Sequence, residues 1–359
     1  MSKIPISVCI IAKNEEKHIG ECLKHLTKYG MEIVVTDTGS TDKTKEIAEK
    51  YADKVAEFEW NDDFSAARNY CASVAGNNWI LVIDCDEYVT DMDVGRLRIL
   101  TQKFPRYTGI IRLKNLILNG NGETSYVSDD VPRLYNKNYY HFELPVHEQI
   151  RYINCQKNDE PEDTINAFML PMEVIHHGYA LTGEEMVRKQ KRNLQLLHKL
   201  LESEPENGYH YFQIGQSNFV LGNIDAAIEA YETGMKLYDN PDKVYVAEMI
   251  VSLAKAYCEK GRLADAMALL DKYSGVYNTA KFTFEHANVL MQGKQTIKAL
   301  MLYIKVTTMK DIDTLGERQM DCYAQIMNIY KAMGKEDMAE IFHDKYMKCA
   351  AEKERILNS

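Results

Sequence analysis

The first half of the chain alternates short apolar runs with segments whose apolar residues recur at helical spacing. The runs 6–12 and 79–83 are continuously apolar, which is typical of strands buried on both faces. Residues 14–26 place apolar side chains on one helical face, and Asn14 is suited to cap that helix. This alternation predicts a mostly parallel α/β sheet. Further predicted elements are a strand at 32–36, helices at 41–51 and 66–75, and shorter β-like runs between 110 and 153.

From about residue 180 the helical spacing continues without convincing strands. Thr182 and Glu185 are spaced as a capping box that opens a long helix to about Glu202. Residues 211–237 match residues 249–275, and small residues recur at equivalent positions. This pattern resembles the tetratricopeptide repeat, a helix–turn–helix unit with small residues where its two helices cross. The alternative is an unrelated helical bundle. Two further units centre on Ala287 and Ala299, and on Tyr330, Gly334 and Ala339.

These patterns predict a chain of the α/β plus all-α class, with an α/β domain followed by an all-α domain. We expect an α/β domain over residues 1–180, a linking helix over 181–204 and a helical repeat domain over 205–359. An Asn/Gly turn is expected at 119–123, and the polar stretch 154–166 is expected to be a surface loop.

Charge and cysteine usage exclude several classes of protein. The formal net charge is −10, and no basic stripe is present, which argues against nucleic-acid binding. The excess of acidic residues in the first half of the chain would suit a bound divalent cation or, more commonly, a solvated surface. The eight cysteines form no CxxC or Cys/His pair with zinc spacing, so a structural zinc site is not expected. No apolar stretch predicts a signal peptide or membrane span, and we expect a soluble cytoplasmic protein.

Two of the predicted strands end in acidic residues. Asp37 begins a DTGSTD turn, and in an open parallel sheet ligands bind beyond the carboxyl ends of the strands. We therefore expect Asp37 to project into the crevice and to accept hydrogen bonds from a nucleobase or a ribose. Asp84 and Asp86 should point to one side, with Cys85 on the other. Two carboxylates at a strand end can hold Mg²⁺ or Mn²⁺ against a diphosphate.

A third segment, 64–69, begins a helix, where backbone N–H groups and the helix dipole favour anions. Arg68 is expected on the inner face of this helix. The alternative is that Arg68 forms a surface salt bridge with Asp62 or Asp63.

Together these segments resemble family 2 glycosyltransferases with the GT-A fold, specifically the branch with tetratricopeptide repeats after the catalytic domain. The resemblance covers nearly the whole chain. It is carried in order by CIIAKNEE (9–16), DTGSTD (37–42), DFSAARN (63–69), DCDE (84–87), Arg133-Leu134-Tyr135, Val146-His147-Glu148, and IHHGY (175–179) with Lys191-Arg192-Asn193.

The resemblance implies roles for individual residues of the donor site. Asp37 would recognise the base or ribose of a nucleotide, most often uridine. Arg68 would face the nucleotide or its diphosphate, Asp84 would contact ribose or sugar, and Asp86 would be the principal metal ligand. His176 would complete the metal shell, or else be a buried structural histidine; His177 is less well placed. Ala12, Asn14, Glu15 and Cys85 complete the expected donor site.

The resemblance also implies an inverting reaction. A divalent metal, Mn²⁺ or Mg²⁺, with Arg68 or Arg133 would stabilise charge on the departing diphosphate. A carboxylate would remove the proton of the acceptor, and Glu148 is the candidate base. Glu148 could instead cap a helix or form a loop salt bridge, and Asp129 and Asp130 are the reserve candidates.

The leading hypothesis is thus a metal-dependent glycosyltransferase that moves a sugar from a UDP-sugar to a side chain of a peptide or protein. Stacked repeats form a concave surface that suits an extended peptide, and such repeats also form dimers, so a homodimer is a second use of the helical half. Tyr238, Tyr245, Tyr257 and Tyr273 would serve either use or simply form the repeat core. The alternatives are a transferase of cell-surface glycan biosynthesis and a repeat scaffold with an inactive transferase domain. A nucleotide-sugar pyrophosphorylase is disfavoured because AKNEEKHIG (12–20) is not a Gly-rich basic signature.

Overall fold

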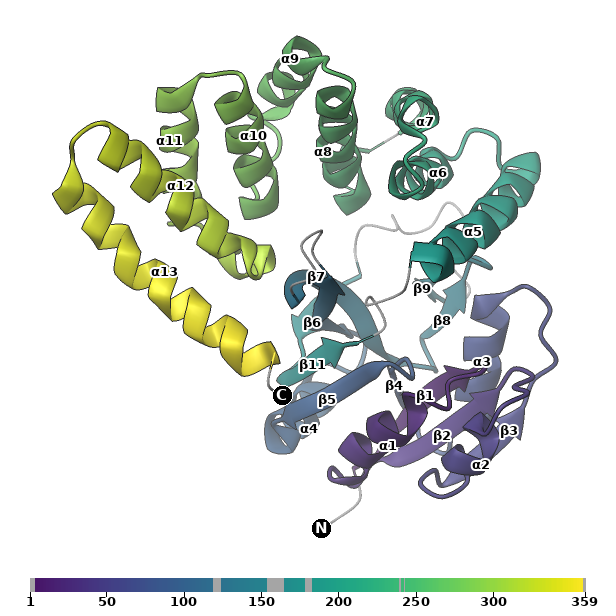
Figure 1. Ribbon diagram of the computed structural model, residues 1–359. Helices are drawn as coiled ribbons and strands as arrows, with labels where there is room; N and C mark the ends of the chain where they lie inside the picture. The colour runs from purple at the N-terminus through teal and green to yellow at the C-terminus, as the bar shows by residue number, and fades with distance from the viewer. Residues whose placement is uncertain are drawn as a thin grey trace. The chain divides into compact units, whose positions relative to one another are not determined.

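The computed structural model describes residues 4–118, 124–153, 165–177, 183–238, 240–241 and 243–357. The chain divides into two compact units (Figure 1). Unit 1 contains residues 1–124, 128–180 and 359, and unit 2 contains residues 125–127 and 181–358. Several predicted features lie outside the described residues: the turn at 119–123, residues 154–164 of the polar loop, Thr182 of the capping box, and Gly178 and Tyr179. The predicted domain boundaries remain a prediction.

Unit 1 is built on a mixed sheet with the strand order β3-β2-β1-β4-β7-β6-β11-β5, and β10 pairs with β6. β1 runs parallel to β2 and β4, and β2 runs parallel to β3. β4 is antiparallel to β7, and β5 is antiparallel to β11. The predicted mostly parallel α/β sheet is therefore confirmed. The strands are β1 (Ile6–Ala12), β2 (Glu32–Asp37), β3 (Lys54–Glu57), β4 (Trp79–Val82), β5 (Glu87–Met92), β6 (Thr108–Leu118), β7 (Thr124–Asn136), β10 (Ala167–Met169) and β11 (Met172–His176).

Alternation along β1 explains why this strand is apolar throughout. Val8 and Ile10 enter one apolar core, and Cys9 enters a second core with Val34. Because successive side chains of a strand point to opposite faces, both faces of β1 are buried. The remaining elements of unit 1 are the helices α1 (Ile19–Thr27), α2 (Thr44–Ala48), α3 (Phe64–Val74) and α4 (Val94–Lys103), and the antiparallel pair β8 (Tyr140–Glu143) and β9 (Gln149–Tyr152).

Two predicted helices of unit 1 are shorter than expected. α1 begins at Ile19, so the prediction that Asn14 caps it is wrong. Asn14 has a φ of 56°, and its side-chain oxygen accepts a hydrogen bond from the backbone of Thr41 instead. The helix predicted over 41–51 is limited to α2, because Asp42 and Thr44 use their side chains in local hydrogen bonds that fix a loop. β3, β5 and α4 were not predicted.

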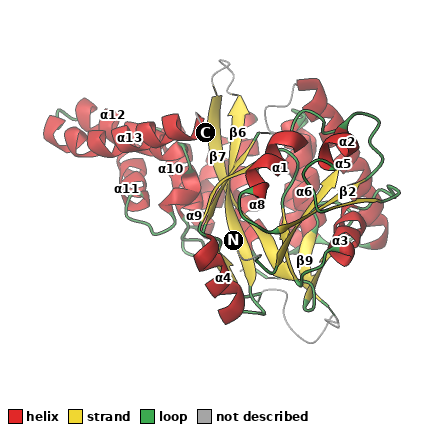
Figure 2. Cartoon of the chain, turned by 90° about the horizontal axis from the view of Figure 1, so that it is seen from below, coloured by secondary structure: helices red, strands yellow, loops and turns green. Residues whose placement is uncertain are grey.

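Unit 2 consists of the long helix α5 followed by antiparallel helix pairs, which Figure 2 shows in red. Among the described residues, α6 to α13 form four such pairs, so the predicted helical repeats are confirmed. No helix in the described ranges is long and apolar enough to cross a membrane. The helices are α5 (Gly183–Ser203), α6 (Gly208–Val220), α7 (Ile224–Leu237), α8 (Val244–Glu259), α9 (Leu263–Tyr273), α10 (Ala280–Gln292), α11 (Thr296–Val306), α12 (Arg318–Ala332) and α13 (Glu336–Leu357), with a 3₁₀ helix η2 (Ile312–Leu315).

Small residues lie where the two helices of each pair cross. At Gly215, an added Cβ would lie 2.3 Å from the ring of Tyr231, so only glycine fits between α6 and α7. One alanine near the start of each second helix is also fully or almost fully buried. These are Ala227, Ala266, Ala299 and Ala339. The tyrosines named in the sequence analysis are buried or packed against the core of the repeats.

Candidate active site

The loops after β1 and β2 are joined by hydrogen bonds at the carboxyl end of the sheet. The backbone N–H of Asn14 donates to Ser40 Oγ at 2.9 Å, and Thr41 N–H donates to Asn14 Oδ1 at 2.8 Å. Asparagine tolerates the left-handed φ of this position better than most residues. The backbone N–H of Glu15 donates to Thr44 Oγ1 at 2.7 Å. The two loops therefore form one rigid wall at the edge where ligands bind in open parallel sheets.

Asp37 ends β2 within this wall and is 6% exposed. One carboxylate oxygen, Oδ2, accepts hydrogen bonds from the backbone of Gly39 and Ser40, each at 3.0 Å. The other, Oδ1, is buried and has no hydrogen-bond partner among the described residues. A buried acceptor without a partner is costly in free energy unless a ligand satisfies it. The Asp37 carboxylate thus suits an N–H or O–H donor such as a nucleobase or a ribose.

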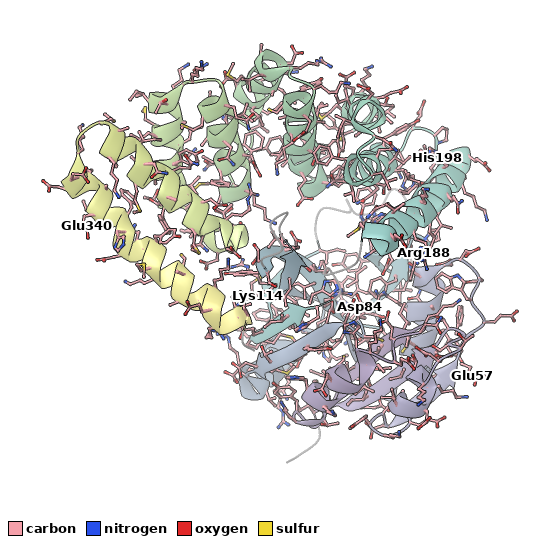
Figure 3. All side chains as sticks on the ribbon, viewed as in Figure 1. Glu57, Asp84, Lys114, Arg188, His198 and Glu340 are labelled. Atoms are coloured by element: carbon pink, nitrogen blue, oxygen red, sulfur yellow. The ribbon has the colours of Figure 1, made fainter. Side chains whose placement is uncertain are left out.

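Asp84, which Figure 3 labels, follows β4 and binds two buried arginines. Arg68 Nη2 donates to its Oδ1 at 3.0 Å, and Arg133 Nη2 donates to its Oδ2 at 2.9 Å. Burial alone would raise the pKa of Asp84, but the two guanidinium groups outweigh burial and lower it. Each oxygen of Asp84 thus accepts one hydrogen bond from an arginine, so this carboxylate is shared between two guanidinium groups. The alternative partners of Arg68, Asp62 and Asp63, are not used; Asp63 caps α3 instead.

Glu87 is a buried carboxylate of this site whose role the motif alone did not indicate. Its side chain is 0% exposed. Its Oε2 accepts the backbone N–H of Asp84 at 2.9 Å, and its Oε1 pairs with Arg133. Burial raises the pKa of Glu87, while Arg133 acts in the opposite direction. Glu87 therefore fixes both the turn that carries Asp84 and the arginine that binds it.

Glu148 lies at the other side of Arg68. Arg68 Nε donates to Glu148 Oε1 at 2.7 Å. Burial raises the pKa of Glu148, but Arg68 outweighs burial and the pKa is lowered. Glu148 is thus held as a carboxylate near neutral pH. Arg68 Nη1 is buried and has no partner among the described residues, so this arginine has one donor group left for an anion.

The segment that carries Glu148 is held by side chains of α3. Ser65 Oγ donates to the carbonyl of Leu144 at 2.6 Å. The Asn69 side chain both donates to and accepts from the backbone of Phe142, at 2.8 and 2.9 Å. Leu144 has a φ of 74°, which is unfavourable for a branched side chain. The motif 63–69 therefore supplies Arg68 and also the hydrogen bonds that fix residues 142–148.

Asp86 and His176 lie together on the side of β11. His176 Nε2 lies 3.2 Å from Asp86 Oδ2, and His176 Nδ1 lies 2.8 Å from Asn115 Oδ1. Burial lowers the pKa of His176, but Asp86 and its neighbouring carboxylates outweigh burial and raise it. Asn115 in turn donates to Asp129, and Asp130 is bound by Arg112 on both oxygens. The reserve candidates Asp129 and Asp130 are thus engaged outside the arginine cluster.

The Asp86–His176 pair places one carboxylate beside one imidazole. One carboxylate and one imidazole are suitable ligands for a divalent cation, with a diphosphate and water in the remaining positions. Among the residues that the structure describes, no three His, Cys, Asp or Glu side chains are grouped closely enough to hold a metal ion by themselves. The residues present therefore fit a cation that binds together with an anionic substrate.

Glu15 and Cys85 complete the set of predicted donor-site residues. Burial and the charges of Asp86 and Asp84 raise the pKa of Glu15 to about 7. The Cys85 side chain is 4% exposed and its thiol donates to the carbonyl of Ile11 at 3.6 Å. Ala12 is buried, and its carbonyl accepts hydrogen bonds from Thr38. Cys85 and Ala12 thus support the site through the backbone, whereas Glu15 lies close to the acidic pair.

Comparison with known proteins agrees with this geometry. Residues 7–112 match the family model described as glycosyl transferase family 2. The chain is 29% identical over 270 residues to a TPR repeat-containing protein of Synechococcus elongatus, which covers 75% of this chain and 64% of that protein. It is 26% identical over 328 residues to the SPbeta prophage-derived glycosyltransferase SunS of Bacillus subtilis, which covers 86% of this chain and 75% of the relative.

The chain therefore spans less than two thirds of the Synechococcus protein's length. Among solved structures, S. aureus TarS is similar over 73% of this chain and 54% of that chain, with 16% identity and a TM-score of 0.38.

Proposed function

Because unit 1 carries a glycosyl transferase family 2 domain over residues 7–112, we propose that this chain moves a sugar from a nucleotide-sugar to an acceptor. The observation that carries the proposal is a pair of buried groups, one on Asp37 at the end of β2 and one on Arg68 of α3, which binds Asp84 after β4. Asp37 Oδ1 is a buried acceptor and Arg68 Nη1 is a buried donor, and neither has a partner among the described residues. A nucleoside diphosphate offers N–H or O–H groups to the first and phosphate oxygens to the second.

In this proposal the donor is a UDP-sugar whose base or ribose binds Asp37. Arg68 and Arg133 lie beside Asp84 and provide positive charge near the diphosphate. A guanidinium group in a buried site stabilises the charge that develops on the leaving diphosphate more than the charge of the ground state. A divalent cation bound to Asp86 and His176 would supply further stabilisation of that charge.

Glu148 is the proposed base that accepts the proton of the acceptor. Its ionised form is the form that a base requires, and Arg68 holds it in that form. General base catalysis contributes about 10²–10⁴-fold to a rate. The proposed reaction inverts the anomeric centre, because the acceptor attacks from the face opposite the diphosphate.

The proposed acceptor is a side chain of a peptide or protein. Stacked helix pairs form extended concave surfaces that suit an extended chain. The test is transfer of radiolabel from UDP-glucose, UDP-galactose and UDP-N-acetylglucosamine in a cell extract supplemented with the full chain. Label in the protein or peptide fraction supports the proposal. Label confined to lipid-linked or polymeric glycan favours cell-surface glycan biosynthesis instead.

Calorimetric titration with UDP, GDP, dTDP and CDP, each with Mn²⁺ and with EDTA, tests the donor site first. We expect UDP to bind in the presence of Mn²⁺ and binding to weaken in EDTA. Asp37→Asn should lower UDP affinity about 10–100-fold, because one buried hydrogen bond to a charged group is lost. Asp53→Asn is the matched control, since Asp53 accepts a hydrogen bond from Ile33 at the opposite end of β2. Absence of binding by all four nucleotides would favour the inactive scaffold.

A further inference from the structure

Three half-buried aromatic side chains lie in the segment that joins β3 to the start of α3. They are Phe58, Trp60 and Phe64, and we call residues 58–64 the aromatic loop. None of the three belongs to an apolar core formed by the described residues. The other tryptophan of the chain, Trp79, is 8% exposed and lies in the core of unit 1. Large aromatic rings that lie outside the core and are partly open to solvent are typical of binding sites.

Both ends of the aromatic loop are anchored to the candidate site. The backbone N–H of Phe58 donates to the carbonyl of Asp37 at 2.9 Å, and the backbone N–H of Phe64 donates to the carbonyl of Pro145 at 2.9 Å. Asp37 is proposed to bind the nucleotide, and Pro145 lies three residues before Glu148, the proposed base. The aromatic loop therefore runs from the nucleotide end of the site to the segment that carries the proposed base.

The indole ring of Trp60 is held by two contacts within the loop. Its Nε1–H donates to Asp62 Oδ1 at 3.0 Å. Its ring centroid lies 4.8 Å from that of Phe64, and the rings meet edge to face at 67°. A carboxylate that accepts the indole N–H also polarises the ring and strengthens its negative face. The ring is thus fixed before a ligand arrives, and its face is suited to a cation.

The charge of the aromatic loop disfavours a phosphate group and favours a cation. Figure 3 labels Glu57, which directly precedes the loop and pairs with Lys45. Unlike charges attract and like charges repel over the few ångströms of such a loop. A positively charged side chain therefore complements the loop both through the ring of Trp60 and through the carboxylates around it. Residues 57–64 contain no lysine or arginine and four acidic residues: Glu57, Glu59, Asp62 and Asp63.

We propose that Trp60 and Phe64 form a subsite for an arginine or lysine side chain of the acceptor peptide, next to the side chain that receives the sugar. This inference rests on the proposed function, because it requires a peptide or protein acceptor. The cation lies over the indole ring of Trp60, and the carboxylate of Asp62 adds to the attraction. The subsite selects acceptors that carry a basic residue beside the modified position.

An acceptor side chain fits this loop better than the nucleotide donor does. The donor carries its negative charge on the diphosphate, and Arg68 and Arg133 supply the positive charge that suits it. The aromatic loop has the opposite sign. The candidate site therefore has a cationic part around the two arginines and an anionic, aromatic part around Trp60, and only the second complements a basic peptide.

Binding of short peptides to the full chain tests the proposal without an identified acceptor. The probes are acetyl-Gly-Ser-Arg-Ser-Gly-amide and two peptides with citrulline or leucine in place of arginine. Citrulline keeps the shape of arginine but carries no charge. Dissociation constants come from saturation-transfer NMR. We expect the arginine peptide to bind about three- to tenfold more tightly than the other two, which is the size of an exposed cation–π contact.

The chain contains two tryptophans, so ¹⁵N-tryptophan labelling gives two indole N–H resonances. The arginine peptide should shift the resonance of Trp60 in a saturable manner. The resonance of Trp79 should not move, because Trp79 is buried in the core. Loss of one resonance in Trp60→Phe assigns the pair.

Variants of the aromatic loop separate the ring from the charge. Trp60→Leu keeps an apolar side chain without an aromatic face and should abolish the preference for arginine over citrulline, whereas Trp60→Phe should retain part of it. Asp62→Asn can still accept the indole N–H and should weaken binding of the arginine peptide about twofold or more. Asp91→Asn is the matched control, since Asp91 is exposed on β5, at the opposite end of the strand order from β3. Circular dichroism melting checks that each variant is folded.

Equal affinities for the three peptides, or an unshifted Trp60 resonance, would overturn the proposal. Displacement of the arginine peptide by UDP would also overturn it, because the aromatic loop would then belong to the nucleotide site. Titration with UDP tests the donor site separately. Binding of UDP without a preference for arginine refutes the subsite alone, whereas a preference for arginine without binding of any nucleotide supports the subsite and refutes the proposed donor site.

Discussion

At the scale of single residues, the candidate site depends on how two arginines are shared among three carboxylates. Arg68 binds Asp84 and Glu148, and Arg133 binds Asp84 and Glu87. Glu87 is the most deeply buried of these carboxylates, at 0% exposure of its side chain. An ionised group this deeply buried is stable only when it is paired and hydrogen bonded, which Glu87 achieves through Arg133 and the backbone of Asp84.

Glu87→Gln should therefore lower kcat without abolishing folding. The amide oxygen can still accept the N–H of Asp84, but the charged contact with Arg133 is lost. A hydrogen bond to a charged group contributes about 1.5–3 kcal/mol, which corresponds to about 10–100-fold in rate if it is used only in the transition state. Steady-state kinetics should show a fall in kcat with a smaller change in the KM of the donor.

Two further variants separate this positioning role from a purely structural role. Glu87→Asp keeps the charge and should recover part of the kcat that Glu87→Gln loses. Glu173→Gln removes another partly buried ion pair, that with Lys114, and should leave kcat unchanged. Equal losses of kcat in Glu87→Gln and Glu173→Gln would mean that Glu87 has no particular role in the site.

The positions of site residues at the ends of strands could be predicted from the sequence. The side chains that pair with the two site arginines could not. Asp37 and Asp86 follow apolar strands, so their place at the edge of the sheet follows from the pattern alone. The partners of Arg68 and Arg133 lie 16 to 80 residues away along the chain. No local pattern encodes contacts at this separation, and the sequence therefore did not indicate that Asp84 is occupied by two arginines.

At the scale of elements, one turn position recurs in all four helix pairs of unit 2. Gly222, Gly261 and Gly334 occupy it with φ values of 77°, 72° and 68°. In the third pair the position is Lys294, with a φ of 57°. The left-handed region costs an L-residue roughly 1–2 kcal/mol, whereas glycine adopts it readily. The third turn is therefore strained where the other three are not.

Lys294→Gly should stabilise the chain by about 0.5–1 kcal/mol, since relief of strain exceeds the added flexibility of the unfolded state. Gly261→Ala should destabilise it by about 1 kcal/mol, because alanine meets the strain that glycine avoids. Urea unfolding followed by circular dichroism measures both changes. A decrease in stability for Lys294→Gly would contradict the assignment of strain to this turn.

The sequence located long elements better than short ones. β1 begins and ends where its apolar run does, and the repeats were recognised from their glycine and alanine spacing. The start of α1 was misplaced because Asn14 makes a tertiary contact with Thr41 that competes with capping. β3 and β5 were missed, since their exposed or half-exposed residues alternate too briefly to give a clear pattern.

At the scale of the whole molecule, the two units follow different rules of construction. Unit 1 joins segments distant in sequence, such as β4 with β7 and β5 with β11. Unit 2 joins helices that are neighbours in the sequence, such as α6 with α7 and α12 with α13. For this reason the local repeats predicted the helix pairs of unit 2, whereas for unit 1 the sequence predicted individual strands, helices and the class of sheet but not the order of the strands.

Acid should weaken unit 2 through two buried histidines. Burial lowers the pKa of His210 and His286, and the carboxylates of Glu204 and Asp271 only partly oppose this. The folded state then binds fewer protons than the unfolded state below the unfolded histidine pKa of about 6.5. The stability is complete above that pH and is lost as the pH falls below it through the lower folded pKa values.

Thermal melting at pH 7.5 and pH 5.5 measures this effect. The double variant His210→Gln, His286→Gln should reduce the difference in Tm between the two pH values. His198→Gln is the control, because His198 is exposed on α5. An unchanged pH dependence in the double variant would show that other groups control the acid response.

The hydrogen bonds between α3 and residues 142–148 affect the order in which the parts of the site form during folding. The contacts of Ser65, Arg68 and Asn69 with that segment close loops of 73 to 80 residues. Closing such loops carries an entropic cost that must be met before the contacts form, and non-local contacts of this kind slow folding. We expect Glu148 to join Arg68 late, after β1, β2 and β4 have paired. A partly folded chain would then form the edge proposed to bind the nucleotide before Glu148, the proposed base, reaches Arg68.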